Sequence, residues 1–143
     1  MRFPLLIALA CAGLAGPMTA SAADTASLTV SFTGLEPKGV INLVLVNSAE
    51  AYGDKAAPVA MVQLPVSAAS ASRTFEGLAP GRYAVKAFHD VDGDGKMATN
   101  PLGIPTEPYG FSNNARGAMG PPKWEDAGFA VAPGASTQTI SMN

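Results

Sequence analysis

Short segments of alternating polar and apolar residues, separated by glycine, proline and serine, make up most of the chain after residue 22. Residues 28–33 alternate, with Leu28, Val30 and Phe32 on one side, which is the period of a half-buried strand. Residues 40–46 are almost continuously apolar, as in a central strand covered on both faces. Five more segments read as strands, namely 59–66, 72–75, 83–88, 127–131 and 137–142. About seven short strands at this spacing predict an all-β fold, a single antiparallel β-sandwich.

One corner of this sandwich has a recognisable sequence. The segment Leu78-Ala79-Pro80-Gly81-Arg82-Tyr83-Ala84-Val85 has the form Leu-x-Pro-Gly-x-Tyr-x-Val, in which Pro and Gly favour a turn and the tyrosine begins the next strand. It resembles the corner of prealbumin-like and immunoglobulin-like sandwiches, whose tyrosine hydroxyl caps nearby backbone. The resemblance implies the same role for the hydroxyl of Tyr83.

A long loop, residues 90–126, interrupts the strand pattern. Loops of this length are uncommon in compact domains and are usually functional or disordered. Apolar side chains such as Leu102 and Ile104 can anchor this loop, and its prolines reduce the entropy lost on fixing it. The sequence therefore predicts one long ordered loop that packs on the sandwich. The shorter segment 47–58 also lacks a period and reads as a connecting loop or a brief helical turn.

The long loop opens with Asp90-Val91-Asp92-Gly93-Asp94-Gly95-Lys96. A calcium loop uses carboxylates at its first, third and fifth places, glycine at the sixth and a backbone carbonyl at the seventh. The sequence thus predicts calcium as a cofactor, with the metal ligands Asp90, Asp92, Asp94 and Lys96. An EF-hand loop would also bring flanking helices and a glutamate at the twelfth place, where this chain has Pro101. The alternative is a plain turn in which aspartate side chains bond their own backbone.

Residues 1–22 read as a secretory signal peptide, followed by a β-sandwich domain over residues 23–143. Arg2 supplies the positive start, residues 3–14 an apolar core, and Ala20-Ser21-Ala22 a cleavage site. The competing hypothesis is a lipoprotein anchored through Cys11, although the residues before Cys11 form a poor lipobox. We therefore expect a periplasmic or secreted protein. Cleavage would remove the only cysteine, so the mature domain would have no disulfide.

The charge and hydropathy of the mature chain exclude two kinds of environment, namely a nucleic-acid partner and a transmembrane position. Without Arg2, the mature chain has 8 basic and 11 acidic side chains, a net charge of -3. This acidic balance argues against nucleic acid as a partner. We also expect no transmembrane segment in the mature chain, because no run after the signal approaches the necessary length.

Catalytic chemistry has few candidates in this sequence. His89 is the only histidine, and the serine motif Gly110-Phe111-Ser112-Asn113-Asn114 lacks the second glycine of a nucleophile elbow. A zinc site is disfavoured, because the mature chain would offer one histidine and no cysteine. A pair of loop carboxylates could still meet in space and act as a glycosidase, the candidates being Glu107, Glu125, Asp126 and the Asp90 group.

His89 also has a structural interpretation. Along its strand it shares a face with Tyr83, Val85 and Ala87. We therefore expect it at the rim of the core, bonded to a loop carbonyl or a loop carboxylate.

Three residues of the long loop are candidates for ligand binding. Tyr109 and Trp124 can fix the loop to the sandwich or offer a face to a sugar or peptide, whereas Phe111 is expected to be an anchor. Arg116 can bind an anionic ligand group, or it can bridge loop carbonyls or Asp residues. The expected partner is an unknown carbohydrate, peptide or envelope protein.

Three motifs of the loop together resemble one bacterial family. They are Phe88-His89-Asp90 with Asp94-Gly95-Lys96, then Thr99-Asn100-Pro101-Leu102-Gly103-Ile104-Pro105, then Glu107-Pro108-Tyr109-Gly110-Phe111-Ser112-Asn113-Asn114-Ala115-Arg116-Gly117. Over essentially the whole mature chain, the sequence is similar to the uncharacterised family called domain of unknown function 2141. The resemblance implies an exported bacterial β-domain and carries over no established activity. Relatives often have an aspartate where this chain has Ala98, which removes one potential cation ligand.

The sequence therefore predicts an exported β-sandwich that serves as a binding or accessory module of unknown ligand, stabilised by calcium through the loop 90–96. A hydrolase that uses loop carboxylates is one alternative. A purely structural envelope protein is the other.

Overall fold

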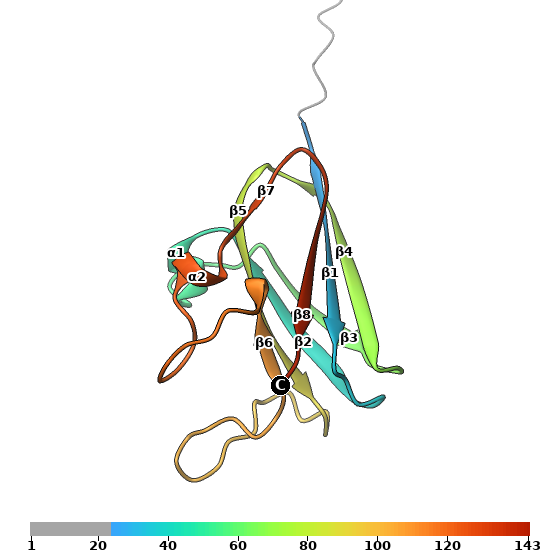
Figure 1. Cartoon of the computed structure of the whole chain (residues 1–143), viewed down its shortest axis with the longest axis vertical. Helices are drawn as coiled ribbons and strands as arrows, with labels where there is room; N and C mark the ends of the chain where they lie inside the picture. Colours follow the sequence, from blue (N-terminus) through green and yellow to red (C-terminus); the bar gives the residue numbers. More distant parts are fainter. Residues whose placement is uncertain (1–23) are drawn as a thin grey trace, which may run out of the picture.

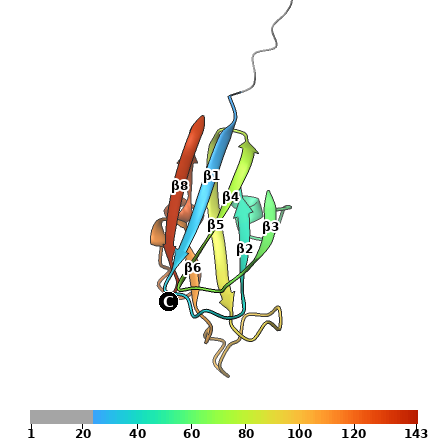
Figure 2. The same ribbon diagram turned by 90° about the vertical axis from the view of Figure 1, so that its right-hand side faces the viewer.

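Eight strands in two sheets form a sandwich in the computed structural model, which describes residues 24–143 (Figure 1). The three-stranded sheet has the order β4-β1-β8 and consists of β1 (Ala26–Thr33), β4 (Ser70–Leu78) and β8 (Gly134–Ser141). The five-stranded sheet has the order β3-β2-β5-β6, with β7 also paired to β5. Its strands are β2 (Val40–Val46), β3 (Ala60–Pro65), β5 (Gly81–Asp90), β6 (Tyr109–Phe111) and β7 (Phe129–Val131). Figure 2 shows the three-stranded sheet in front of the other.

Within the described part of the chain, helical structure is limited to three single turns. These are α1 (Ala49–Tyr52), the 3-10 turn η1 (Ser112–Asn114) and α2 (Trp124–Ala127). Ser48 caps α1, since its hydroxyl accepts a hydrogen bond from the Ala51 N–H at 3.1 Å. Within residues 24–143, no helix has the length and apolar content needed to cross a membrane. The predicted signal peptide and its cleavage site lie outside the described residues.

The predicted β-sandwich is confirmed, with two additions. β1 and β8 run parallel to each other, whereas every other ladder is antiparallel. The long loop is ordered, as predicted, but it contains β6, η1 and α2 and so adds an eighth strand. β6 crosses close to β8: a side chain at Gly110 would place its Cβ 2.6 Å from the Ile140 side chain. Only glycine therefore fits at the centre of β6.

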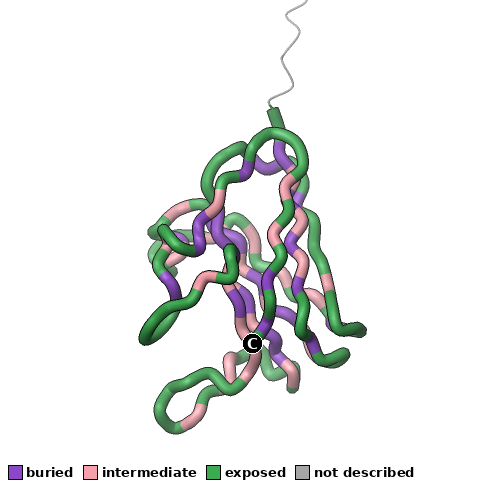
Figure 3. The backbone as a smooth tube through the Cα atoms, in the orientation of Figure 1, coloured by how far each residue is buried: buried purple, intermediate pink, exposed green. Residues whose placement is uncertain are grey.

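Alternation along the strands builds two hydrophobic clusters. The main core lies between the sheets and takes Leu28, Val30 and Phe32 from β1, and alternate residues of β2. The second cluster lies on the outer face of the five-stranded sheet, where Ala51 of α1 and Ala127 of α2 pack with Val46 of β2. This packing explains why β2 is apolar on both faces. In Figure 3, buried positions alternate with exposed and half-buried ones along the strands. Among the described residues, both clusters are built from side chains between Ala26 and Met142.

The corner before β5 forms as expected. The hydroxyl of Tyr83 donates a hydrogen bond to the carbonyl of Ala79 at 2.6 Å. Tyr83 is buried, and this burial raises the pKa of its phenol above 10.0. The tyrosine thus fixes the turn that leads into β5, the strand on which the candidate site is built.

Candidate metal centre and the long loop

The pairing of β5 with β6 brings two distant carboxylates together. Phe88 pairs with Tyr109, and the ladder continues as the N–H of His89 donates to the carbonyl of Pro108 at 2.8 Å. One step further, an antiparallel register places Glu107 opposite Asp90. Asp90 at the end of β5 and Glu107 just before β6 therefore lie side by side.

Asp90, Asp92 and Glu107 form an acidic triad that could hold a metal ion. One carboxylate oxygen from each lies within 4.8 Å of the other two. Asp90 is buried, Glu107 is half-buried and Asp92 is exposed, so the triad opens to solvent on one side. Two of these residues were predicted as ligands from their spacing, but Glu107 was not. Glu107 was predicted only as a carboxylate that could pair with the Asp90 group, because its spacing from Asp90 follows no metal-loop pattern and the strand register alone brings it to the site.

Asp90 organises the turn that follows β5. Its Oδ1 accepts hydrogen bonds from the N–H groups of Gly93 and Asp94 at 2.8 and 3.1 Å, and its Oδ2 accepts one from Gly95 at 2.7 Å. Burial raises the pKa of Asp90, but these hydrogen bonds and one with Asp92 outweigh burial and bring the pKa below 3.8. The sixth place of the loop, Gly95, has a φ of 80°, as the predicted calcium loop requires.

The other two aspartates bond their own backbone. Asp92 Oδ1 accepts from the Asp94 N–H at 3.1 Å, and Asp94 Oδ1 accepts from the Lys96 N–H at 2.8 Å. These are the bonds of the plain aspartate turn considered as the alternative. Asp94, predicted as a ligand, lies outside the triad, whereas Lys96 was predicted to ligate through its backbone carbonyl and stays a prediction. The side chain of Lys96 is exposed.

Glu107 closes the first part of the long loop. Its Oε1 accepts from the N–H of Val91 and its Oε2 from the N–H of Ala98, both at 2.9 Å. A carboxylate oxygen has two lone pairs, so each oxygen of Glu107 keeps one acceptor site. The hydrogen bonds of the turn and the ligation of a cation are therefore compatible.

Like charges crowd Asp92. The N–H of Asp94 lowers the pKa of Asp92, but desolvation, the hydrogen bond with Asp90 and the charges of Asp94 and Glu107 together raise it above 3.8. Protonation of Asp92 relieves this repulsion. A bound cation would relieve it as well.

Ser112, predicted as the nearest motif serine to His89, is a buried structural residue. Its hydroxyl donates to the carbonyl of Ala127 at 2.5 Å and accepts from the N–H of Val85 at 2.9 Å. His89 is fully buried, and its Nε2 donates to the carbonyl of Lys38 at 2.7 Å, which confirms the expected bond to a loop carbonyl. Ser112 and His89 thus bond backbone groups instead of each other.

The two asparagines after Ser112 join separate parts of the fold. Asn113 adopts a φ of 59°, and its Nδ2 donates to the carbonyls of Asp126 and Gly128, both at 3.0 Å. Asn114 accepts from the N–H of Ser141 on β8 at 2.8 Å. The motif of residues 112–114 therefore links β5, the α2 region and the three-stranded sheet.

Trp124 begins α2 and belongs to the second hydrophobic cluster. Its ring lies 5.9 Å from that of Tyr52, and the guanidinium of Arg82 lies 5.9 Å from its centroid. Arg82 also donates to the carbonyl of Glu125 at 2.9 Å, so it fills the bridging role that the sequence offered for Arg116. Glu125 and Asp126, the other candidate carboxylates, lie on α2 and not in the triad. Burial and the charge of Asp126 raise the pKa of Tyr52 to about 12.

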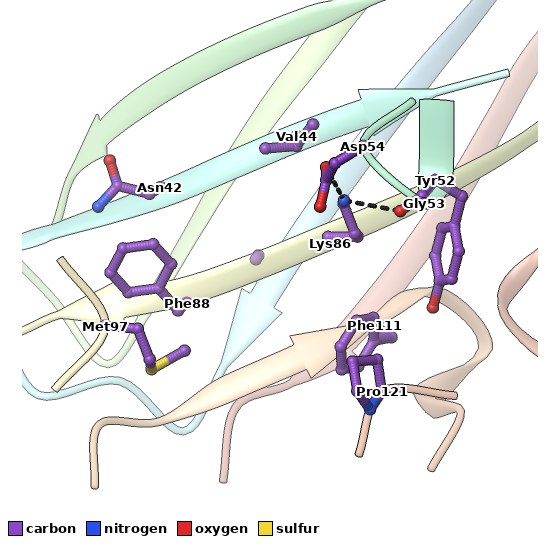
Figure 4. Close-up of a pocket in the computed structure, with 11 residues that line it drawn as sticks. Asn42, Val44, Tyr52, Gly53, Asp54, Lys86, Phe88, Met97, Phe111 and Pro121 are labelled. Carbon is purple, nitrogen blue, oxygen red and sulfur yellow. Dashed lines mark hydrogen bonds and ion pairs between the residues drawn. The ribbon is translucent and has the colours of Figure 1, made fainter. Parts of the chain in front are cut away.

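Two of the hollows on the outer face of the five-stranded sheet are lined by residues of the long loop. The first, of about 460 Å³, has Lys86 in its floor, bonded to Asp54 at 2.6 Å and to the carbonyl of Tyr52 at 2.9 Å (Figure 4). The second, of about 710 Å³, is lined by Tyr109 and by two apolar parts of the long loop. Phe111 lines both hollows and is half-buried.

Of the three predicted ligand-binding residues, Tyr109 alone lines one of these hollows; Arg116 and Trp124 line neither. Arg116 is exposed, and among residues 24–143 no hydrogen bond or ion pair involves its side chain. Its predicted bridging of loop carbonyls is therefore not found.

Comparison with known proteins identifies the family. A family model for an uncharacterized protein conserved in bacteria (DUF2141) matches residues 30–140. No curated protein and no solved structure matches the chain. The family match runs from β1 to β8 and includes the acidic triad and the motif of residues 112–114. The chain therefore belongs to this bacterial family of unknown function, DUF2141.

Proposed function

We propose that this protein is an exported β-sandwich binding or accessory module whose loop 90–96 is stabilised by calcium. The observation that carries the proposal is the approach of Asp90, Asp92 and Glu107 to within 4.8 Å of one another. Calcium binds oxygen ligands and tolerates flexible geometry with six to eight of them. The triad supplies oxygen ligands only, and its crowded negative charges favour a doubly charged cation.

Particular oxygens of the triad remain available for a cation. Asp92 uses only its Oδ1 in the turn, and Glu107 keeps one lone pair on each oxygen. Asp90 Oδ2 accepts from the N–H of Gly95 at 2.7 Å, and its second lone pair faces only the Asn42 amide at the long distance of 3.5 Å, so this second lone pair can ligate a cation. In the proposal, the carbonyl of Lys96 and water complete the shell. A site with this much solvent should be weak, with a Kd on the order of 10⁻⁴ to 10⁻³ M.

Calcium should therefore raise the thermal stability of the protein. At about ten times Kd, a ligand that binds only the folded state stabilises it by roughly 1.4 kcal/mol, which raises Tm by a few degrees. Asp92→Asn should remove most of this shift and leave the apo fold intact, since an amide oxygen can still accept from the Asp94 N–H. Thermal unfolding by circular dichroism, with and without calcium, measures both effects.

The matched control is Glu125→Gln, which neutralises an exposed carboxylate on α2 outside the triad. Its calcium-dependent shift should equal that of the wild type. A wild-type Tm that does not respond to calcium, or an equal response in Asp92→Asn, would contradict the proposal and leave only the aspartate turn.

Export is the second part of the proposal. Arg2, the apolar run 3–14 and Ala20-Ser21-Ala22 support a signal peptide, and cleavage after Ala22 would leave β1, which begins at Ala26, intact. We expect a mature N-terminus at Ala23 or Asp24. Intact-mass analysis of protein from the cell envelope measures it. Full-length chain in the cytoplasm, or acylation at Cys11, would contradict export by this route.

A further inference from the structure

One side of the sandwich is closed by hydrogen bonds. The N–H of Tyr109 on β6 donates to the carbonyl of Asn143, just after β8, at 3.1 Å, and the N–H of Asn143 donates back to the carbonyl of Tyr109 at 3.3 Å. Asn114 covers the outer edge of β8, because it accepts from the N–H of Ser141 at 2.8 Å and donates to the carbonyl of Thr139 at 3.2 Å. The end strands on this side, β6 and β8, therefore both have partners.

The opposite side of the sandwich ends in β3 and β4 (Figure 2, right). β4 is a poor edge for pairing with another chain: Gly77 has a φ of 68° where the register with β1 shifts, and Arg73 and Glu76 add exposed charges. Bulges and charges are the features by which natural sheets prevent edge-to-edge association.

β3 has neither of these protections. Residues 56–72, which include the whole of β3, contain no charged residue, and the register of β3 with β2 is unbroken over residues 60–65. Within residues 24–143, no strand pairs with the outer side of β3. β3 is therefore the edge of this sandwich that is open to a further strand.

Backbone N–H groups along β3 alternate between β2 and solvent. The N–H of Val66 donates to the carbonyl of Gly39 at 3.1 Å, and the register with β2 continues evenly from this pair. In an antiparallel ladder, the N–H groups of residues 60, 62 and 64 then also face β2. Those of Met61 and Gln63 consequently face outwards.

The outward positions on either side of this pair have no free donor. Pro65 has no N–H, and the N–H of Val59 donates to the carbonyl of Leu45 at 2.8 Å. The open edge thus offers two donors, on Met61 and Gln63, between two positions that offer none.

We propose that β3 pairs with β3 of a second copy of this chain, antiparallel about a two-fold axis at Val62. This register places Met61 opposite Gln63 of the second copy, and each such pair exchanges both of its N–H···O bonds. Every outward donor of one copy then finds an acceptor on the other. Val59 lies opposite Pro65 of the second copy, so the positions without a free donor meet each other. This match of the edge with itself favours a second copy over an unrelated extended peptide.

Side chains on the core face of β3 fit the same register. Ala60, Val62 and Leu64 are only partly buried, at the margin of the main core. In the dimer, Val62 lies opposite Val62 of the second copy, and Ala60 lies opposite Leu64, a small side chain against a large one. The pairing therefore covers apolar surface that a single copy leaves in solvent.

Charge also favours this edge. The chain has a net charge of -2, whereas residues 56–72 are uncharged, so two copies can meet along β3 with little repulsion. One strand edge buries less than the roughly 1,200 Å² of a stable interface. The dimer should therefore be weak, with a Kd on the order of 10⁻⁵ to 10⁻⁴ M. The pairing requires neither calcium nor export.

Sedimentation equilibrium of the whole purified protein, at concentrations below and above this Kd, measures the dimer. Met61→Lys should weaken it at least about tenfold, because the two new cations would lie diagonally across the seam, roughly 7 to 8 Å apart. The side chain of Met61 is 74% exposed, so the substitution should leave the fold of one copy intact. Met119→Lys is the matched control: it makes the same change at a fully exposed methionine of the long loop, and should dimerise like the wild type.

Disulfide cross-linking tests the register. In a chain that carries Cys11→Ala and so has no other cysteine, Val62→Cys should form a linked dimer with oxidised glutathione, because residue 62 faces its own copy. Gln63→Cys should cross-link at least about fivefold more slowly, because residue 63 lies opposite residue 61.

Three results would overturn the proposed dimer. They are a wild-type protein that stays monomeric well above the expected Kd, equal dimerisation of Met61→Lys and the wild type, and equal cross-linking rates at residues 62 and 63. A monomer that takes up an extended peptide along β3 would also exclude the second copy as the occupant of this edge.

Discussion

Ser112→Ala should destabilise the sandwich by about 2 to 4 kcal/mol. The hydroxyl is buried and satisfies two backbone groups, the N–H of Val85 and the carbonyl of Ala127. Leaving a buried polar group without a partner costs about 1 to 3 kcal/mol. Alanine at residue 112 leaves both the N–H of Val85 and the carbonyl of Ala127 without this partner. Urea unfolding followed by circular dichroism measures the loss.

An exposed serine provides the control for this substitution. Ser72 lies on β4 with its side chain in solvent, so Ser72→Ala should change the free energy of unfolding by less than about 0.5 kcal/mol. If Ser112→Ala also changed the free energy of unfolding by less than about 0.5 kcal/mol, the structural role of the motif of residues 112–114 would be contradicted. A chemical role for Ser112 would then be favoured.

Trp124→Ala should cost about 2 to 3 kcal/mol. The indole contacts Tyr52 and lies beneath the guanidinium of Arg82, so its removal leaves a gap in the second hydrophobic cluster. The estimate lies below the full range for a core tryptophan, because Trp124 is only half-buried. Chemical denaturation measures this loss, which decides whether the ring anchors the loop or is displayed for a ligand.

Two further variants serve as comparisons for the stability loss of Trp124→Ala. Trp124→Phe should recover much of the lost stability, since a smaller ring can still pack on Tyr52. Met119→Ala, which truncates a fully exposed loop residue, should change the free energy of unfolding by less than about 0.5 kcal/mol. If Trp124→Ala behaved like Met119→Ala, the display of Trp124 for a sugar or peptide would be favoured.

Local pattern was enough to predict the frame of this fold. The alternation of Leu28, Val30 and Phe32 and the apolar run of β2 follow directly from which faces are buried. The Tyr83 corner could be recognised because its turn chemistry is local. Each of these features depends on residues that are neighbours in sequence, or on one strand face.

Long-range pairing could not be predicted in the same way. β6 has three residues, too few to display a period, and it alone carries Glu107 to Asp90. The parallel pairing of β1 with β8 leaves no mark in the alternation, because the period of a strand is the same in either direction. Glu107 was consequently predicted only as one of several loop carboxylates that could meet the Asp90 group, and not as a metal ligand, whereas both aspartates were predicted as ligands.

The two arginines illustrate the same limit. Arg116 lies in a loop motif and was predicted to bridge loop carbonyls, whereas no such role was predicted for Arg82 in the corner before β5. The structure places Arg82 over Trp124 and beside the carbonyls of Glu125 and Gly128. An arginine can bridge carbonyls only where the fold places them near its guanidinium. For Arg82, the carbonyl of Glu125 lies 43 residues away in the sequence, so local pattern could not predict this contact.

The binding of calcium by the acidic triad is most directly tested by a calcium titration followed by amide resonances in two-dimensional NMR. The account predicts that the amides of residues 92–96, together with those of Ala98 and Glu107, shift with a single Kd on the order of 10⁻⁴ to 10⁻³ M. Asp92→Asn should weaken the same response, and Glu125→Gln should preserve it. Amides that stay in place throughout the titration, or that shift only around Glu125 and Asp126, would contradict a calcium site at Asp90, Asp92 and Glu107.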